Sequence, residues 1–418
     1  MMQRHKRLGS QRQKRQQTLP CLQAVKRASA AVPSMYKDRL RAHLATKSAN
    51  AALRCLQVAE RQRLDFSSND YLGLSQQPEI IAAYQQGLQQ WGCGSTSSPL
   101  VRGYSRPHHE LAEYLADWLG YARVLLFSSG FSANSGTLQA LQTLKLTPVL
   151  DKLAHASLYD AVKPRQFQRF RHNDYAHLEQ LCEQLRSNAE EPLVVTESVF
   201  SMDGDQVDLR QLAALKARQQ HVLMIDDAHA LGVLGKDGQG IRGHDDSDCI
   251  DILTGTFGKA CGLGGAFVAG DQDVIEFLLQ ECRHYIYSTA FAPAQAVAIQ
   301  TALKLIRSTP ELRQQLQQNV SYWQQGLGSL GLAVADHQQP IQPLLVGRND
   351  DAVTLASRLQ AQGIDCIAIR PPTVPVGTAR LRISIRANHS IDDIDRLLTS
   401  LEHCLQQDSA LAEAMYVS

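Results

Sequence analysis

The sequence predicts an α/β protein with a large domain built on a mostly parallel sheet and a smaller α+β domain after it. From about residue 123, short β-branched or apolar runs alternate with segments of helical periodicity. Such alternation is typical of a parallel sheet that helices cover on both faces. The chain of 418 residues is also long enough for two domains, because single cores rarely grow beyond about 250–300 residues.

The alternation predicts the elements of the large domain in turn. The expected strands are the apolar runs at residues 123–127, 148–151, 192–198, 221–226, 251–257 and 265–270. Helical periodicity covers residues 135–144 and 155–162, and a glycine-rich bend joins the last two strands. A long helical stretch from about Pro293 through residues 313–327 then links this domain to the rest of the chain.

After about residue 331 the pattern predicts a compact α+β lobe. The expected elements are strand, helix, strand, strand and helix, at residues 341–347, 351–362, 364–370, 379–385 and 391–405. No internal repeat interrupts this order, so one copy of each domain is expected.

The chain divides into four parts on this pattern. Eight Lys and Arg and no acid in the first thirty residues predict a basic, disordered extension over residues 1–34. A helix-like pattern opens at Met35, which could be an alternative start. We expect an N-terminal segment over residues 35–90, the large domain over residues 91–310 and the small C-terminal domain over residues 311–418.

The composition indicates a small-molecule partner and a reducing, cytoplasmic environment. Lys and Arg number 42 against 41 Asp and Glu, so the net charge of +1 gives no overall attraction to nucleic acid or to an anionic membrane. The nine cysteines form no C-x-x-C pair and no zinc-like spacing, so neither a disulfide framework nor a metal site is expected. No apolar run approaches the ~20 residues of a membrane-spanning helix.

Polar segments follow four of the expected strands, at residues 128–134, 151–157, 226–232 and 254–265. Ligands of open α/β sheets bind beyond the carboxyl ends of the strands, so these segments are the candidates for a site. The small residues at 128–131 could hold a phosphate at a helix start, or could serve only the geometry of the turn.

Two ionisable residues in these segments have a specific chemical use. The Asp226 carboxylate could keep a ring nitrogen protonated, although an aspartate after a strand often only caps the next helix. The Lys259 amine could form a Schiff base with a carbonyl cofactor, although most lysines are solvated surface charges. His229, taken alone, is more often a packed histidine.

Taken together, the segments resemble a known family. Residues 226–229 and 256–259 match the α-oxoamine synthase branch of the fold-type-I pyridoxal-phosphate enzymes. The same family is matched in order by residues 66–74, 130–131, 155–157, 201–205 and 370–375. The resemblance runs from about residue 39 to residue 405.

The resemblance implies pyridoxal 5′-phosphate (PLP) as the cofactor. Lys259 would be its covalent anchor and the base that removes the substrate Cα proton, and Asp226 would pair with the pyridine nitrogen. His155 would stack on the ring, His229 would approach the phenolic oxygen, and Ser201 would hydrogen-bond near the ring. His155 is expected to be catalytic as well as cofactor-binding.

On the phosphate side, the resemblance assigns the backbone N–H groups of Gly130 and Phe131 and the hydroxyl of Thr256. Family members are homodimers with active sites at the subunit boundary, so Ser288 and Thr289 are expected to reach the neighbour's phosphate. The alternative for that pair is an ordinary N-cap of the helix that follows. Cys261 stands where relatives have a small or apolar residue, and a small thiol should fit there.

The substrate-binding residues implied by the resemblance are Arg370, Thr373, Asn69 and Arg41. A planar guanidinium matches a carboxylate through two parallel bonds, so Arg370 would clamp the amino acid. Thr373 would lie beside the acyl substrate. Arg41 would meet its distal end, with Arg39 as a competitor for that role.

The reaction implied is the condensation of L-alanine with a pimeloyl thioester, on coenzyme A or a carrier protein, with loss of carbon dioxide, for biotin synthesis. Three alternatives stay open. One is the sister reaction of glycine with acetyl-CoA, one is an aminotransferase, and one is a catalytically silent scaffold subunit. Fold analogy alone does not separate them, so the choice depends on the site residues.

Overall fold

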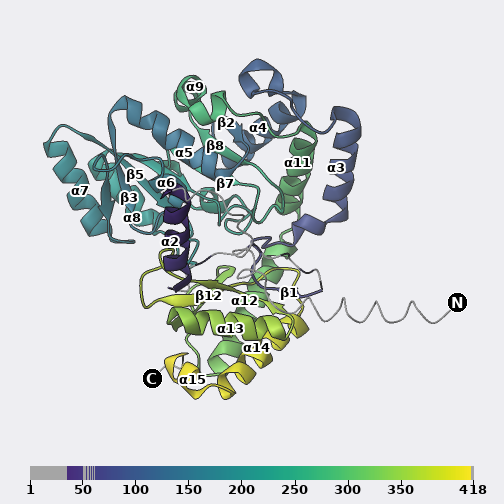
Figure 1. Cartoon of the computed structure of the whole chain (residues 1–418). Helices are drawn as coiled ribbons and strands as arrows, with labels where there is room; N and C mark the ends of the chain where they lie inside the picture. The colour runs from purple at the N-terminus through teal and green to yellow at the C-terminus, as the bar shows by residue number, and fades with distance from the viewer. Residues whose placement is uncertain are drawn as a thin grey trace.

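The structure is a computed structural model that describes residues 35–49, 53, 56, 58, 60 and 62–415. The basic extension expected over residues 1–34 therefore lies outside the described residues. Figure 1 shows the chain arranged in two lobes, with the teal and green large lobe above the yellow-green C-terminal lobe. This division agrees with the expected order of a large domain followed by a smaller one.

A seven-stranded sheet forms the centre of the large lobe, in the order β2-β8-β7-β6-β5-β3-β4. Its strands are β2 (Arg123–Phe127), β3 (Leu146–Asp151), β4 (Gln168–Phe170), β5 (Glu191–Glu197), β6 (Val222–Asp226), β7 (Ile252–Thr256) and β8 (Ala266–Gly270). The pairs among β3 to β7 are parallel, while β8 runs antiparallel to both β2 and β7. The predicted fold class, a mostly parallel α/β sheet, is confirmed.

Helices cover both faces of this sheet because both faces are apolar. In β2, Val124 and Leu126 join one core cluster while Leu125 and Phe127 join the other, as expected for side chains that alternate across a strand. The first cluster includes residues of α4 (Arg106–Leu119), α7 (Tyr175–Ser187), α8 (Leu209–Gln219) and α11 (Pro293–Ser308). The second includes residues of α5 (Gly130–Leu141), α9 (Gln272–Glu281) and α10 (Arg283–Ile286).

Two expected helical segments differ from the structure. The long helical stretch is two helices, α11 and α12 (Glu311–Ser329), and the break falls at Thr309 and Pro310. Proline disfavours the helical conformation of the residue before it and has no N–H to continue the ladder. The helix expected over residues 155–162 is confined to the short α6 (Ala156–Tyr159).

The C-terminal lobe contains a three-stranded antiparallel sheet, β11-β12-β9, covered by helices. Its elements are β9 (Ile341–Gly347), α13 (Asn349–Ala361), β11 (Ile367–Ile369), β12 (Ala379–Ser384), α14 (Ile391–Gln406) and α15 (Ser409–Met415). The prediction of a single strand over residues 364–370 was wrong. Its first part is β10 (Ile364–Asp365), which pairs in parallel with β1 (Leu64–Asp65), and only its second part joins β12.

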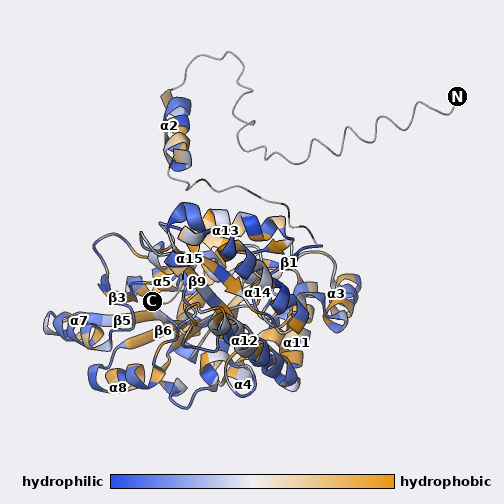
Figure 2. Cartoon of the chain, turned by 90° about the horizontal axis from the view of Figure 1, so that it is seen from below, coloured by the Kyte–Doolittle hydropathy of each residue, from blue (hydrophilic) through white to orange (hydrophobic). Residues whose placement is uncertain are grey.

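The N-terminal elements differ in how they contact the body. The helix expected to open at Met35 is α2 (Met35–Ala49), and none of its residues is buried. It overlaps the lower lobe in Figure 1, but Figure 2, turned by 90°, shows it standing clear of the body. In contrast, α3 (Pro78–Trp91) packs along α11. No helix in the described part of the chain has the length and apolar character needed to cross a membrane.

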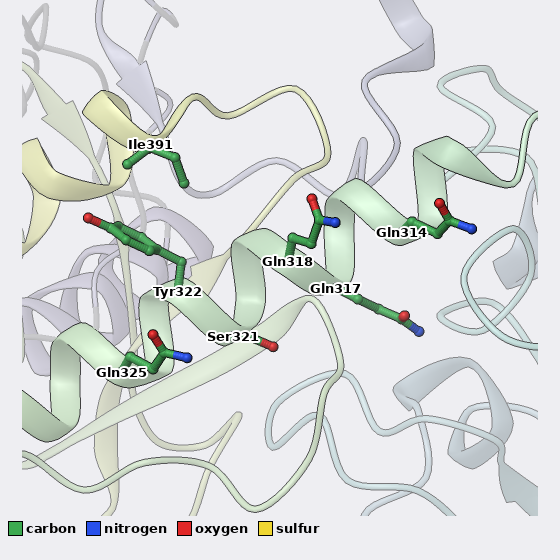
Figure 3. A pocket seen from close by; sticks show the side chains of 7 residues that line it. All are labelled: Gln314, Gln317, Gln318, Ser321, Tyr322, Gln325 and Ile391. Carbon is green, nitrogen blue, oxygen red and sulfur yellow. The ribbon is translucent and has the colours of Figure 1, made fainter.

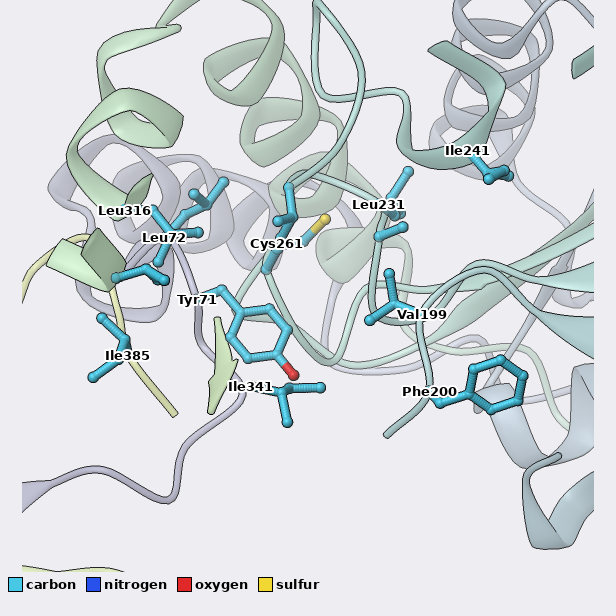
Figure 4. Packing of buried hydrophobic residues seen from close by; sticks show 14 of the residues in the cluster. Tyr71, Leu72, Val199, Phe200, Leu231, Ile241, Cys261, Leu316, Ile341 and Ile385 are labelled. Carbon is cyan, nitrogen blue, oxygen red and sulfur yellow. The ribbon is translucent and has the colours of Figure 1, made fainter. Parts of the chain in front are cut away.

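Buried side chains from both lobes meet below the carboxyl ends of the strands. Tyr71 is fully buried there and belongs to one cluster with residues of the large lobe and of the C-terminal lobe. Figure 4 shows it among its neighbours, which include Val199, Leu231, Cys261, Ile341 and Ile385. This shared core fixes the C-terminal lobe against the edge of the sheet.

Candidate active site

The candidate site lies at the carboxyl edge of the large sheet, where neighbouring strands end in polar residues. Asp226 closes β6, in register with Glu197 at the end of β5 and with Thr254 in β7. His155 follows the end of β3, and Lys259 follows the end of β7. The strand-end segments selected from the sequence therefore meet at one edge.

Asp226 is held by a buried polar network from three elements. Its Oδ2 accepts a hydrogen bond of 2.6 Å from Nδ2 of Asn134 in α5. The Asn134 Oδ1 in turn accepts 2.6 Å from the hydroxyl of Thr254. The carboxylate is 6% exposed, so this network sets its direction before any ligand binds.

Asp226 does not cap a helix, which was the alternative role expected for it. Its Oδ1 accepts from the backbone N–H of Ala228 at 2.9 Å, in a turn that no helix follows. Asp227 closes the next loop instead, by accepting from the backbone N–H of Ile241 at 3.1 Å. Asp226 therefore keeps a carboxylate at the strand end.

His155 is joined to the same network through Ser157. Ser157 Oγ accepts from Nδ2 of Asn134 at 3.0 Å and lies 2.8 Å from His155 Nδ1. The backbone N–H of Ser157 also donates to that nitrogen, at 3.2 Å, so Nδ1 acts as an acceptor. Burial lowers the pKa of His155, although the Asp226 carboxylate opposes the shift. A neutral imidazole of fixed orientation results, which suits ring stacking.

His229 is fixed by residues that the sequence reasoning did not select. Its Nδ1 lies 2.7 Å from the hydroxyl of Tyr71, which also accepts from Nη2 of Arg382 at 3.2 Å. Burial and the positive charges of Lys259 and Arg382 hold the pKa of His229 well below its usual value. His229 is therefore a neutral ring, not a charged one.

Lys259 is half-buried in the bend between β7 and β8. Burial lowers the pKa of its amine to about 8, against the opposing effect of the Asp226 and Glu197 carboxylates. An amine with this pKa is unprotonated for an appreciable fraction of the time near neutral pH, so it can act as a nucleophile or base.

The residues after Lys259 are tightly packed. Cys261 is fully buried, and burial raises the pKa of its thiol to about 12, so it packs as a small apolar group, as expected. Gly262 has a positive φ of 69°, and an added Cβ would lie 2.4 Å from the backbone nitrogen of Ser75. Only glycine fits that approach.

Glu197 is a second buried carboxyl group beside the site. It is 2% exposed, and its Oε1 has no hydrogen-bond partner among the described residues. Burial and the neighbouring Asp226 charge raise its pKa well above the usual value. Like charges at close range disfavour a second charge, so the Asp226 carboxylate adds to the effect of burial on Glu197.

The segment before α5 has the geometry of an anion site. Ser129 caps the helix by accepting from the backbone N–H of Ser132, at 3.2 Å. The N–H groups of Gly130 and Phe131 lie in the first turn, where a helix has no internal partners for them. Thr256 lies next to Gly130, and its hydroxyl accepts from the backbone N–H of Gly258 at 3.2 Å.

This set of residues fits PLP on chemical grounds. An amine of lowered pKa suits the carbonyl carbon of the cofactor, and the Asp226 carboxylate suits its ring nitrogen. The first turn of α5 with Thr256 suits its phosphate. Ser157 holds the His155 ring in a fixed orientation without any ligand, so the ring is ready to stack on the cofactor.

Ser201 and Asn69 are placed beside this edge by backbone and side-chain contacts. The carbonyl of Ser201 accepts from Nε of Arg382 at 2.6 Å. Asn69 Oδ1 accepts from the hydroxyl of Tyr71 at 3.1 Å, in the chain that leads to His229. Arg382 and Tyr71 thus connect both predicted residues to the site.

Ser288 and Thr289 are not helix caps, because α11 begins at Pro293 with Ala292 as its N-cap. Ser288 is partly exposed and Thr289 is exposed on this chain. The structure describes one chain, so their predicted contact with a neighbouring subunit stays a prediction.

Of the four predicted substrate residues, Arg370 and Thr373 lie together after β11, while Arg41 lies apart from them. Arg370 follows β11 and is half-buried, and Thr373, whose backbone N–H donates to the Arg370 carbonyl at 3.0 Å, is exposed. Arg41 lies on α2, which stands clear of the body, and pairs with Asp38 at 3.2 Å. Arg41 is therefore not at the site in this arrangement.

A separate shallow pocket lies on the outer side of α12 (Figure 3). Its lining is mostly amide side chains along one stripe of the helix, with Tyr322 and Ile391 at one end. None of the predicted site residues lines it. Because it lacks the apolar, concave character of ligand sites, we assign it no function.

Residues missed by the sequence reasoning form the support of the site. Asn134, Thr254 and Ser157 lie inside the selected segments, so their polar type near a strand end was a usable signal. Arg382 was not separable from other arginines, because its contact with Tyr71 spans 311 positions in the sequence.

Comparison with known proteins gives one family. The family model described as "Aminotransferase class I and II" matches residues 61–401. A curated 8-amino-7-oxononanoate synthase from Aeromonas hydrophila subsp. hydrophila is 47% identical over 366 residues, covering 87% of this chain and 90% of the relative.

Solved structures agree in fold. A serine palmitoyltransferase from S. paucimobilis with bound PLP–myriocin superposes with a TM-score of 0.81 at 26% identity, over 90% of this chain and 100% of the other. An 8-amino-7-oxononanoate synthase from Francisella tularensis superposes with a TM-score of 0.71 at 28% identity, over 84% and 100%.

Proposed function

Because the chain belongs to the 8-amino-7-oxononanoate synthase family of PLP-dependent acyltransferases, we propose that it condenses L-alanine with a pimeloyl thioester. The products are 8-amino-7-oxononanoate, carbon dioxide and the free thiol. The observation that carries the proposal is the half-buried Lys259, with a lowered pKa, at the same sheet edge as Asp226 and His155.

PLP, when bound, supplies an electron sink for the electron pair left at the substrate Cα. The residues proposed to hold it are Lys259, Asp226, His155, His229, Ser201 and Thr256, with the N–H groups of Gly130 and Phe131. Asp226 keeps a positive charge at the ring nitrogen, and the Asn134 bond keeps the carboxylate aimed at it.

Lys259 has a second proposed role as the base. Its amine can take up the Cα proton of alanine because the pKa of about 8 leaves part of it unprotonated near neutral pH. The same group, once protonated, can return a proton to carbon after carbon dioxide leaves. His155 is proposed to hold the reacting carbon in place from the other side, as a neutral ring.

Substrate recognition is proposed to come from the segment after β11. A guanidinium at Arg370 suits the alanine carboxylate, and Thr373 suits the acyl chain. Asn69 is proposed to contact the substrate beside Tyr71. Arg41 or Arg39 reaches the distal carboxyl end only if α2 takes another position against the body.

A homodimer is proposed to complete the site. Large apolar side chains are exposed on two segments that contact each other: Val101 is 79% and Tyr287 is 70% exposed. The backbone N–H of Ala290 donates to the Ser97 carbonyl at 3.1 Å, which joins these segments. Apolar exposure of this kind beside Ser288 and Thr289 supports a subunit contact there.

The cytoplasm is the proposed compartment, because all seven cysteines among the described residues are unpaired. The proposed acyl donor is pimeloyl-CoA or a pimeloyl carrier protein.

We expect the purified holoenzyme to prefer pimeloyl-CoA with alanine over acetyl-CoA with glycine. Burying the four additional apolar carbons of the pimeloyl chain would favour it by about 3.2 kcal/mol, roughly 200-fold. The measurement is a competition at equal concentrations, with products counted by mass spectrometry. Faster turnover of acetyl-CoA with glycine would assign the sister reaction instead.

A further inference from the structure

His172 lies between two carboxylates outside the set of residues assigned above. It follows β4, and its Nδ1 is 3.0 Å from Asp151 Oδ1 while its Nε2 is 2.6 Å from Asp205 Oδ2. Asp151 is fully buried, and the ring meets Phe200 edge-on at 4.4 Å between centroids. Among the described residues, no group of His, Cys, Asp or Glu has the geometry to hold a metal ion.

The geometry determines the charge of the ring. A carboxylate accepts hydrogen bonds, so a short contact at each ring nitrogen favours a hydrogen on both nitrogens of His172. Burial alone would lower the pKa of His172, but the hydrogen bonds to Asp151 and Asp205 outweigh it and raise the pKa to about 10. His172 is thus an imidazolium that bridges two anions.

One of these anions fixes the segment that carries His155. Asp151 closes β3, and its Oδ1 also accepts from the backbone N–H of Leu153 at 2.7 Å. Its Oδ2 accepts from the backbone N–H of Asn173 at 3.1 Å. The turn that begins at Asp151 leads directly to His155, so the carboxylate sets the start of that turn.

The other anion fixes the hairpin over residues 199–206, which carries Ser201. The hairpin is closed by a bridge between Val199 and Gln206, and the Asp205 carbonyl accepts from Phe200 N–H at 2.9 Å. Beyond the Ser201 contact with Arg382, Asp203 in the same hairpin pairs with Arg380 of β12. The hairpin therefore connects the site to the C-terminal lobe.

We propose that the His172 imidazolium is a positioning residue that fastens the His155 segment and the Ser201 hairpin to each other across the edge of the sheet. Asn173 also donates to both carboxylates, from its backbone N–H to Asp151 and from Nδ2 to Asp205 at 2.9 Å, but it brings no charge. His172 supplies the positive charge that two neighbouring carboxylates need. The inference rests on the proposed function in one respect: His155 and Ser201 are taken as site residues.

The protonation of His172 can be measured without any substrate. Nitrogen NMR of the holoenzyme labelled at histidine should show both ring nitrogens of His172 protonated at pH 8, with His172→Gln used to assign the signal. A ring with one unprotonated nitrogen at pH 8 would overturn the proposal. This result does not depend on which acyl donor the enzyme uses.

The kinetic test changes one carboxylate and follows pH. In Asp205→Asn, His172 faces Asp151 as its one remaining anion, so the pKa of His172 falls. As pH rises, the ring loses its second proton and no longer fastens the His155 segment to the Ser201 hairpin. A group whose pKa is raised in the folded state contributes its stabilisation at pH values below that pKa. In wild type, the charged His172 therefore holds the two segments together up to about pH 10. We expect solvent-deuterium exchange at the alanine Cα to drop at least about tenfold from pH 6.5 to pH 9 relative to wild type.

Asp208→Asn is the matched control. It makes the same carboxylate-to-amide change three positions later, where Asp208 caps α8 by accepting from Gln211 N–H at 3.1 Å, and Asn caps equally well. Its pH profile should follow wild type. If the pH profile of Asp205→Asn runs parallel to those of wild type and Asp208→Asn, the positioning role is overturned.

A failure of the positioning role of His172 can be told apart from a failure of the proposed function. His172→Gln should lower the exchange rate constant about 10–100-fold while changing the KM for alanine less than about threefold. If His172→Gln does not fold, the pH profile of Asp205→Asn still tests the positioning role. A wild-type protein that exchanges the Cα proton but forms no product with either pimeloyl-CoA or a pimeloyl carrier protein would reject the proposed function and leave the His172 result intact.

Discussion

Lys259→Ala is expected to lose the covalent link to PLP and to reduce turnover by on the order of 10⁴-fold or more, because one side chain supplies both the anchor and the base. The fold should stay intact, since the side chain is half-buried and its amine is not a core contact. Borohydride reduction of wild type followed by peptide mapping should find the cofactor label on Lys259.

The control for this change is Lys304→Ala, an exposed lysine of α11 that should keep the label and the activity. A label on any other lysine in wild type would reject the anchor. Substantial turnover by Lys259→Ala would reject the base.

Asp226→Asn is expected to slow Cα deprotonation by on the order of 10³-fold, the usual cost of removing a preorganised electrostatic contact. The new amide oxygen can still accept from Asn134, so the change loses only the bond from the Ala228 N–H and the fold should survive. Cofactor affinity should fall much less than the rate. The measurement is solvent-deuterium exchange at alanine, with cofactor binding followed by absorbance.

Asp248→Asn, whose side chain is 95% exposed, is the matched carboxylate-to-amide control. Exchange by Asp226→Asn at the rate of this control would mean that the carboxylate does not act on the ring nitrogen.

The residues that follow strands could be predicted from the sequence because chain order and sheet topology fix them. Asp226, His155 and Lys259 lie where the alternation of strands and helices puts the carboxyl ends. The fold class followed from the same alternation, and the order of strands β3, β5, β6 and β7 brings their ends together.

The support of the site could not be predicted in the same way. Tyr71 reaches His229 across 158 positions and Arg382 across 311. No local period or spacing encodes such pairs, since they arise from how the C-terminal lobe packs on the sheet. His172 was missed for the same reason, because its carboxylate partners come from separate segments.

Two errors had local causes. Residues 364–370 contain one apolar run, but the two halves hydrogen-bond to different partners, β1 and β12. The helical period continues through Pro310, while proline ends the helix there. A third difference concerns Arg41, which the resemblance assigned to the distal end of the acyl substrate: α2 has no buried residue to hold it near the site.

The most direct test of the central claim follows the carboxyl carbon of alanine. The holoenzyme is incubated with carboxyl-labelled L-alanine and a pimeloyl thioester, and released carbon dioxide and the amino ketone are counted together. We predict that labelled carbon dioxide and 8-amino-7-oxononanoate form in equal amounts, and only when both substrates are present. Formation of pyruvate with the label retained would show transamination and contradict this account.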